Sequence, residues 1–325
     1  MYRGTIYPNA NFDDGRVAEA LERAMRGGRD DKERGVLLLV QANNAQRQMI
    51  RTPYKVRYGK DLEEELKKSL KGDLEEVILS LMNTPTKEDV VELHKATKGL
   101  GTNEKVLTEI FCSRTNEEME SIKNTYYMNY NKRLEDAIIG DTSGDFKKLL
   151  LTLVQSNRDE SVYPDAFKAQ KDAEVLAKPL EKKIIGGGGD KYEKYGILGR
   201  ESFAQLRRTF EEYARKTGST LDKAIEKELS SDFGDACMAL YQIAMFGRAK
   251  YFANQLYNAV KGKGTRDADL IRVLVSRAEI DLDEIKDHFQ ALTGRPLSEV
   301  VREECKGAYK DALVALVKGN KNLTY

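Results

Sequence analysis

The sequence has few of the residues that break helices and few of those that most often carry chemistry. Its 325 residues include 6 prolines, 3 cysteines and 2 histidines. Few breakers among many helix formers favour an all-helical (all-α) protein. His94 and His288 occupy unrelated positions, and no Cys/His pair, HExxH or GxSxG motif is present. We therefore predict that the protein is not an enzyme.

The sequence also lacks the marks of a membrane-spanning or secreted protein. No apolar run approaches the ~20 residues that cross a bilayer. Residues 1–8 show no basic stretch followed by an apolar one. Cys112, Cys237 and Cys305 are odd in number and far apart, which is typical of reduced thiols in a core. These features predict a cytoplasmic protein, although a missing signal does not exclude unconventional secretion.

The sequence also lacks an excess of positive or negative charge. The formal net charge is +1, and no cluster of four or more Lys or Arg occurs. Binding to nucleic acid through its phosphates is therefore disfavoured, and so is bare electrostatic attraction to anionic lipid. If the protein meets an anionic surface, another source must supply the positive charge.

A repeat of about 70 residues runs through most of the chain. Counted from the four anchors Arg29, Gly101, Gly188 and Gly264, leucine recurs at +33 and at +52 in every copy. The residues are Leu62, Leu134, Leu221 and Leu297, then Leu81, Leu153, Leu240 and Leu316. Chance does not hold this register over four copies.

Each copy has helical periodicity. Val106, Leu107, Ile110 and Phe111 show the 3.6-type spacing in the second copy. The residues at +30 predict helix ends with positive φ, which Gly and Asn adopt most cheaply: Gly59, Asn131, Gly218 and Gly294. We expect four or five helices per copy, and the copies should pack together to bury their apolar faces.

The anchors divide the chain into a short N-terminal segment, four repeats and a linker. Pro164 and the charged residues 168–172 mark the linker as a surface segment. The predicted bounds are 1–14 for the N-terminal segment, 15–84 for repeat 1, 85–157 for repeat 2, 158–172 for the linker, 173–247 for repeat 3 and 248–325 for repeat 4.

The anchors of three repeats lie in glycine-rich loops, over residues 98–102, 186–189 and 261–265. Glycine lets the backbone turn sharply and aim its carbonyl oxygens at one point. At +40 from each anchor stands an acid: Asp141, Glu228 and Glu304. Carbonyl oxygens with one carboxylate suit calcium rather than zinc or magnesium.

Such a loop is often only a turn, and it can also cradle a phosphate. The Lys-Ser/Thr pair of a nucleotide-binding P-loop does not follow it here. A structural turn needs no carboxylate forty residues away, yet the acid recurs in three copies. One carboxylate neutralises half of the charge of a calcium ion, which leaves the ion open to lipid phosphate.

These motifs resemble those of the annexin family, whose repeat carries a Lys-Gly-x-Gly-Thr loop followed some forty residues later by an acid. The resemblance covers about residues 15–320. The matching stretches are 98–102 with Asp141, 261–265 with Glu304, 113–115, 140–145, 270–277 and 44–48. It implies a curved disc of four five-helix repeats, with calcium and phospholipid on its convex face.

The resemblance also implies the calcium (Ca2+) ligands. These are the carbonyls of Thr97, Gly99 and Gly101 with Asp141, those of Gly186 and Gly188 with Glu228, and those of Val260, Gly262 and Gly264 with Glu304. The implied function is calcium-dependent peripheral binding to acidic phospholipid membranes when calcium rises. A protein or cytoskeletal partner would bind through the N-terminal segment, and no nucleic acid is implied.

Two repeats depart from the pattern. Repeat 1 has Arg29 where the second loop glycine should be and Ser69 in place of the acid. We predict that it does not bind calcium in the usual way, although Asp30, Asp31 and Glu33 could make a weaker site. The four glycines of residues 186–189 raise the entropy cost of ordering that loop, which predicts a lower affinity.

Two alternatives stay open. In the family, arginines at +13 pair with acids in a central polar channel, and the candidates here are Asp89, Glu92, Arg114 and Arg272. A buried salt-bridge network that fixes packing is favoured over an ion pathway. The alternative function is a helical scaffold for protein partners, which would bind in the presence of a calcium chelator.

Overall fold

The structure is a computed structural model that describes residues 3–99, 101–178, 189–229, 231–262 and 264–321. These residues form α-helices and no β-strand, which confirms the all-helical class. None of the described helices has both the length and the apolar character that crossing a membrane requires.

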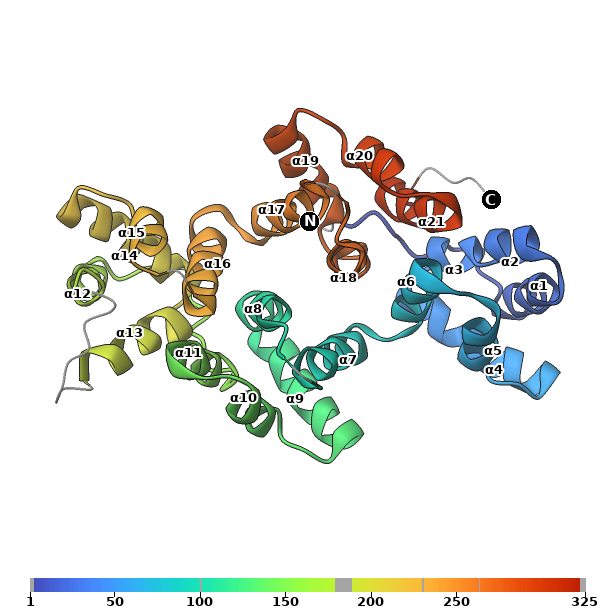
Figure 1. The fold of residues 1–325 in the computed structure, drawn as a ribbon, viewed down its shortest axis with the longest axis horizontal. Coiled ribbons are helices and arrows are strands. Elements are labelled where there is room, and N and C mark those ends of the chain that lie inside the picture. The colour runs from blue at the N-terminus through green and yellow to red at the C-terminus, as the bar shows by residue number, and fades with distance from the viewer. Residues whose placement is uncertain (1–2, 100, 179–188, 230, 263, 322–325) are drawn as a thin grey trace. The chain divides into compact units, whose positions relative to one another are not determined.

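The helices form two compact units, and the first is discontinuous in sequence (Figure 1). Unit 1 combines Met1–Pro85 with Ala249–Tyr325, and unit 2 consists of Thr86–Arg248. Repeats 1 and 4 therefore share unit 1, while repeats 2 and 3 share unit 2.

Unit 1 packs helices from the two ends of the chain against each other. Its helices are α1 (Asp14–Arg26), α2 (Arg29–Gly35), α3 (Leu37–Gln41), α4 (Asn44–Tyr58), α5 (Leu62–Ser69), α6 (Gly72–Met82), α17 (Arg248–Val260), α18 (Asp267–Arg277), α19 (Leu282–Thr293), α20 (Leu297–Glu304) and α21 (Gly307–Lys318). Helix α6 contacts α18 and α21, and α3 contacts α21. Repeats 1 and 4 thus share one core.

Unit 2 is built in the same way from repeats 2 and 3. Its helices are α7 (Pro85–Thr97), α8 (Glu104–Ser113), α9 (Asn116–Tyr130), α10 (Leu134–Asp141), α11 (Gly144–Leu153), α12 (Ala166–Leu176), α13 (Gly189–Arg200), α14 (Phe203–Thr217), α15 (Leu221–Glu228) and α16 (Asp232–Phe246). Helix α8 of repeat 2 packs against α16 of repeat 3, and α11 packs against α13 and α16.

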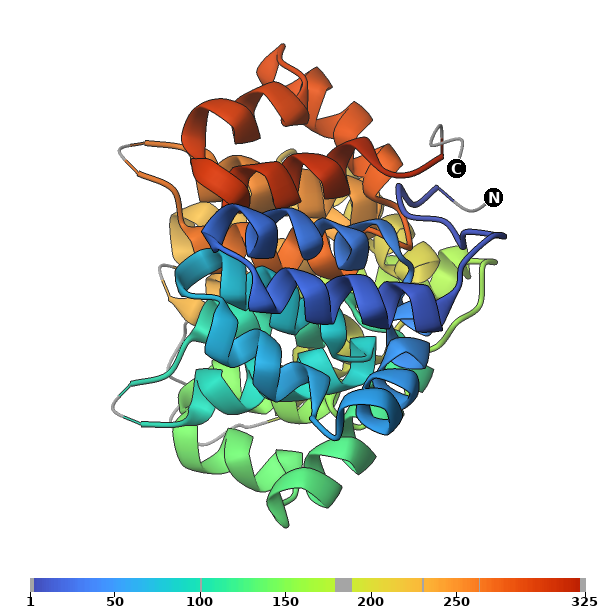
Figure 2. The ribbon, with the colours of Figure 1, turned by 90° about the vertical axis from the view of Figure 1, so that its right-hand side faces the viewer.

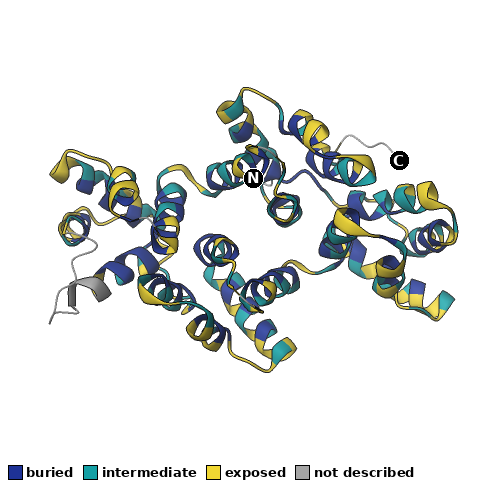
Figure 3. Ribbon diagram, in the orientation of Figure 1, coloured by how far each residue is buried: buried dark blue, intermediate teal, exposed yellow. Residues whose placement is uncertain are grey.

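The predicted helix ends are confirmed. Helices α4, α9, α14 and α19 each end at a residue in the left-handed region: Gly59 (φ 65°), Asn131 (φ 48°), Gly218 (φ 74°) and Gly294 (φ 71°). The leucine that follows at +33 begins the next helix each time and is buried. Figure 3 shows the buried sides of the helices facing their neighbours within each unit.

The second half of the predicted linker is helical. Pro164 and Asp165 precede α12, and the Asp165 carboxylate accepts hydrogen bonds from the Phe167 and Lys168 amides, at 2.8 and 3.0 Å. Asp172 is only 9% exposed because α12 packs against α14. Within residues 168–172, Ala169 and Asp172 therefore lie on the packed face of α12, while Lys168 and Lys171 are exposed as predicted. Only the stretch before α12 is a loop.

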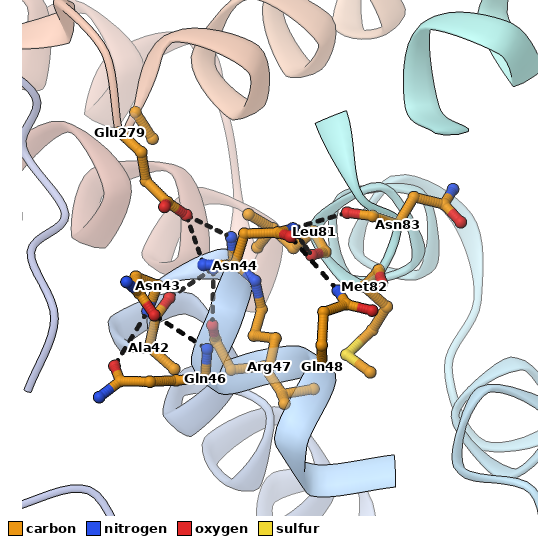
Figure 4. A network of polar contacts seen from close by, with 12 residues as sticks. Ala42, Asn43, Asn44, Gln46, Arg47, Gln48, Leu81, Met82, Asn83 and Glu279 are labelled. Carbon is orange, nitrogen blue, oxygen red and sulfur yellow. Dashed lines mark hydrogen bonds and ion pairs between the residues drawn. The ribbon is translucent and has the colours of Figure 1, made fainter. Parts of the chain in front are cut away.

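A buried polar network joins repeat 1 to repeat 4 in unit 1 (Figure 4). Arg47 of α4 is 3% exposed, and its guanidinium lies 2.9 Å from the carboxylate of Glu279, beyond the end of α18. The same carboxylate accepts from the Asn44 amide at 2.6 Å. Burial lowers the pKa of Arg47 to about 10 against the attraction of Glu279. A buried pair of this kind fixes one arrangement of the two repeats.

The N-terminal segment is attached to repeat 4. The Thr5 hydroxyl donates to the Leu316 carbonyl at 2.7 Å, and the Thr5 amide donates to the Ala278 carbonyl at 2.7 Å. Ile6 is 1% exposed. The beginning of the chain thus contributes to the core of unit 1.

Candidate calcium-binding loops

The described glycines in the loops of repeats 2 and 4 have matching φ values. Gly99 and Gly262 have φ values of 106° and 105°, and Gly101 and Gly264 have 95° and 87°. No atom lies within 4 Å of where a Cβ would stand at any of the four. The glycines are therefore required by the backbone turn, since other residues rarely adopt this region, and not by crowding.

One hydrogen bond closes each loop. The Asn103 amide donates to the Ala96 carbonyl at 2.9 Å, and the Arg266 amide donates to the Ala259 carbonyl at 2.8 Å. These pairs occupy the same positions in the two repeats. The loops project beyond the ends of the helices they connect (Figure 2).

The carbonyl oxygens that we predicted as ligands belong to these loops. Thr97 and Val260 are the last residues of α7 and α17, where helix carbonyls lack intrahelical donors. No described residue donates a hydrogen bond to the carbonyls of Gly99, Gly101, Gly262 or Gly264. The loops therefore offer several oxygen atoms whose hydrogen-bonding capacity is unused.

The acid at +40 lies beside the loop in both repeats. The Thr102 hydroxyl donates to the Asp141 carbonyl at 2.8 Å, and the Thr265 hydroxyl donates to the Glu304 carboxylate at 3.4 Å. Asp141 and Glu304 are the last residues of α10 and α20. Among the described residues neither carboxylate has a cationic partner. Carbonyl oxygens beside a free carboxylate fit the oxygen ligands that calcium takes.

Repeat 3 is described only in part. Glu228 is the exposed last residue of α15, the place that Asp141 and Glu304 hold in α10 and α20. Gly186 and Gly188 lie outside the described residues. The carboxylate half of the predicted repeat 3 site is thus in the expected position of its own repeat.

Repeat 1 has a helix where the other repeats have a loop. Gly27 and Gly28 have ordinary φ values of −78° and −69°, and α2 begins at Arg29. The Asp31 carboxylate accepts from the Gly28 amide at 3.0 Å, while Arg29 lies 2.6 Å from Glu33. Across the described chain no three Asp, Glu, His or Cys side chains gather as a metal cluster. The side chains of Asp30, Asp31 and Glu33 therefore do not form such a group in this structure, and a weaker calcium site in repeat 1 stays a prediction.

His94 and the three cysteines are packing residues. The His94 ring stacks on Tyr130 with centroids 3.7 Å apart, and burial lowers its pKa. Cys112, Cys237 and Cys305 are buried free thiols, as predicted. Burial raises the pKa of Cys112 to about 12, so this thiol is a poor nucleophile at neutral pH.

The charges proposed for a polar network pair locally. Arg114 donates two hydrogen bonds of 2.7 Å to Asp89 inside unit 2, and Arg272 donates one of 2.9 Å to Asp269 inside unit 1. Glu92 lies 2.8 Å from Lys95. Each of these ion pairs lies within a single repeat, so the inter-repeat salt-bridge network stays a prediction.

Our sequence analysis missed one recurring feature near the acids. Gly72, Gly144 and Gly307 stand at +43 from their anchors and have φ values of 63°, 59° and 60°. Each opens the helix that follows the +40 residue. The signal was present, because glycine recurs at this distance in three copies.

Comparison with known proteins identifies the repeat. The Annexin family model matches four times, over residues 16–81, 88–153, 175–240 and 251–316. The chain is 41% identical to annexin A5 of Gallus gallus over 318 residues, which cover 98% of each chain.

Solved structures agree in fold. The structure of annexin III superposes with a TM-score of 0.91 at 37% identity and covers 98% of this chain and 97% of its own. A calcium-bound annexin, annexin (Sm)1, matches with a TM-score of 0.81 at 29% identity over 98% of this chain and 93% of its own.

Proposed function

Since the chain belongs to the annexin family, whose members generally bind phospholipid in a calcium-dependent way, we propose that it binds acidic membranes through calcium held in repeats 2, 3 and 4. The observation that carries this proposal is the shared geometry of two loops. Repeats 2 and 4 combine the same pair of positive-φ glycines, the same closing hydrogen bond and an unpaired acid. The protein would perform no chemical reaction.

In the proposed mechanism, loop carbonyls and one carboxylate hold the ion from one side. In repeat 2 these are the carbonyls of Thr97, Gly99 and Gly101 with Asp141, and in repeat 4 those of Val260, Gly262 and Gly264 with Glu304. Calcium supplies positive charge that a nearly neutral chain lacks. Lipid phosphates complete the oxygen shell, so calcium and lipid each strengthen the binding of the other. Linkage of several sites in one chain makes each later contact intramolecular.

Co-sedimentation with phosphatidylserine vesicles tests the proposal directly. The protein should pellet with calcium and stay in the supernatant with excess chelator. Equal pelleting in both conditions would point to a calcium-independent surface. No pelleting in either would favour the scaffold that binds protein partners.

Acid variants assign the sites. We expect Asp141→Ala and Glu304→Ala each to raise the calcium concentration for half-maximal vesicle binding by about tenfold, since ligand charge tunes calcium affinity. Ser69→Ala, at the same position of repeat 1, is the matched control and should change nothing. Equal shifts for all three variants would defeat the assignment.

We further propose that the protein is cytoplasmic at low calcium and moves to membranes when calcium rises. A protein partner of the N-terminal segment would meet its exposed residues, such as Ala10 and Asn11, because Thr5 and Ile6 are buried against repeat 4. Imaging of a tagged protein before and after a calcium ionophore tests the movement.

A further inference from the structure

A cavity of about 680 Å³ lies in unit 2 and is lined by residues of repeats 2 and 3. Its walls include the end of α8, the first turns of α9 and α14, the loop before α12 and Arg248, the last residue of unit 2. The calcium loop of repeat 2 precedes the first residue of α8, whereas the cavity lies at the last, roughly 15 Å along this 10-residue helix. The cavity is therefore distinct from the predicted calcium site of repeat 2.

Two arginine side chains meet at one aromatic ring in this cavity. The guanidinium carbon of Arg158 lies 4.5 Å from the centre of the Phe203 ring, and that of Arg248 lies 5.7 Å from it. Burial lowers the pKa of Arg158 to about 10, and the like charge of Arg248 acts in the same direction. Arg114 lines the cavity too, but Asp89 already neutralises it. The fold thus holds two positive charges close together, an arrangement that a negatively charged ligand group would relieve.

No carboxylate of the described chain neutralises Arg158. Its guanidinium donates to the backbone carbonyls of Glu201 and Leu198, at 2.6 and 2.9 Å, and no acid lies within 4.0 Å of it. The Glu201 carboxylate pairs with Lys168 instead. Two neutral carbonyls orient the guanidinium without cancelling its charge, and they leave some of its N–H groups available to an anion.

Two helix starts add unused donors to the same cavity. Asn116 and Glu117 open α9, Phe203 and Ala204 open α14, and all four residues line the cavity. Backbone amides in the first turn have no partner within their own helix, and none of these four donates to another group of the described chain. The positive ends of two helices therefore border the cavity together with the two arginines.

Exposure separates the charges of the cavity. The acids that line it, at positions 117, 159 and 160, are all exposed, whereas the two arginines are half-buried. The Asp159 carboxylate accepts from the Ser161 amide at 2.9 Å, and the Glu160 carboxylate accepts from the Asn116 side chain at 3.0 Å. The carboxylates thus lie at the solvent edge, and the guanidinium donors lie deeper.

We propose that this cavity binds a small phosphate monoester without calcium, its phosphoryl oxygens at Arg158, Arg248 and the open amides of α9 and α14. A doubly charged phosphoryl group matches two arginines, and guanidinium groups bind its oxygens in pairs. Val162, which lines the cavity and is 71% exposed, offers apolar surface to the organic part of the ligand together with Phe203. The inference goes beyond calcium-dependent membrane binding and does not rest on it. Inorganic phosphate shares the charged chemistry, so the test separates the two sources.

Calorimetry of the full chain in excess chelator and low salt tests the ligand. The probes are phenyl phosphate, inorganic phosphate and benzoate. We expect phenyl phosphate to bind about threefold to tenfold more tightly than inorganic phosphate, since its ring buries apolar surface. Benzoate, which carries a single negative charge, should bind more weakly than phenyl phosphate. Equal binding of the two phosphates would overturn the monoester as the ligand, and no binding of either would overturn the site.

Charge variants test the location. Arg248→Gln should weaken the binding of phenyl phosphate about tenfold, because it removes a charge-assisted hydrogen bond. Arg207→Gln, at an exposed arginine of α14 outside the cavity, is the matched control and should bind as wild type does. Equal losses in both variants would overturn the location.

A variant that improves binding guards against misfolding as the explanation. Glu117→Gln removes a negative charge at the edge of the cavity and should tighten the binding of phenyl phosphate about twofold. Unchanged or weaker binding in this variant, with a circular dichroism spectrum like that of wild type, would contradict the proposal. Calcium-dependent pelleting of Arg248→Gln on phosphatidylserine vesicles should match wild type, so failure of the membrane function is a separate result.

Discussion

Repeats 1 and 4 share one compact unit, yet the connection between the first and second helix of the repeat differs between them. In repeat 4 a loop with two positive-φ glycines separates α17 from α18, and Glu304 lies beside it. In repeat 1 the chain leaves α1 through two glycines of ordinary φ and enters α2 at once. Further along the two repeats the corresponding helices α5 and α20 have the same length, 8 residues each.

The difference shows that a repeat can lose its ion site and keep its architecture. Arg29 stands where Gly264 stands, and arginine does not adopt the left-handed region cheaply. A helix start accepts it instead, where it pairs with Glu33 one turn later. The packing positions remain, since Tyr54 and Phe289 are both fully buried at +25. Core and loop are therefore independent parts of the repeat.

The Arg47–Glu279 network joins repeats 1 and 4, and Arg47→Ala should break this network. Removing the guanidinium leaves Glu279, whose side chain is 28% exposed, without its charged partner, and the loss of a hydrogen bond between charged groups costs about 1.5–3 kcal/mol. Chemical denaturation followed by circular dichroism measures the loss. Arg29→Ala removes an arginine that is 87% exposed and should lower the free energy of unfolding far less. Equal losses would mean that the network does not join the repeats.

Alanine at the loop glycines sharpens the comparison. Gly262→Ala places a side chain at φ 105°, which costs about 1–2 kcal/mol or redirects the carbonyl. We expect the calcium requirement for vesicle binding to rise about tenfold, since 1.4 kcal/mol is a tenfold change. Gly28→Ala, at φ −69°, is the matched control in repeat 1 and should bind as wild type does. A similar rise in both variants would contradict the loop assignment.

The smallest expected effect concerns Asp73, which lines a cavity of unit 1 together with Asp267. Because the pKa of Asp73 is raised in the folded protein, its ionised form costs stability at neutral pH, and the cost fades as pH falls through that pKa. Asp73→Asn should stabilise unit 1 at pH 7 by less than about 0.5 kcal/mol, with a gain that shrinks toward pH 4. Thermal melts across this range measure it, with Asp30→Asn as the charge-matched control. A destabilised variant at pH 7 would reverse the inferred sign.

Local sequence signals were enough to predict the helix ends and the proximity of each described glycine loop to its acid. The register at +30 and +33 gave the helix ends at Gly59, Asn131, Gly218 and Gly294, because positive φ restricts residue type strongly. The spacing of glycine loop and acid paired residues 101 and 141, which the structure connects through Thr102. Both signals repeat at fixed distances, so chance resemblance was easy to reject.

Contacts between distant segments were beyond the reach of the same reasoning. The Arg47–Glu279 pair joins residues 232 positions apart, and no periodicity marks it. The helix within the predicted linker was missed because Asp172, among exposed charged neighbours, resembles part of a solvated segment until α14 covers it. The cavity of unit 1 depends on repeat 4 lying against repeat 1, which a repeat pattern alone does not specify.

The discontinuity of unit 1 has a consequence for how the molecule is made. Unit 2 is continuous and can close as soon as Arg248 has been synthesised. Repeat 1, although it is made first, must wait for Ala249–Tyr325 before its core is complete. At about 5–20 residues per second, synthesis from Thr86 to the end of α21 at Lys318 (318 − 85 = 233 residues) takes roughly 12 to 47 s. During that interval the apolar faces of α3 and α6 lack their partner α21, so the nascent chain is most exposed to misassociation at its oldest end.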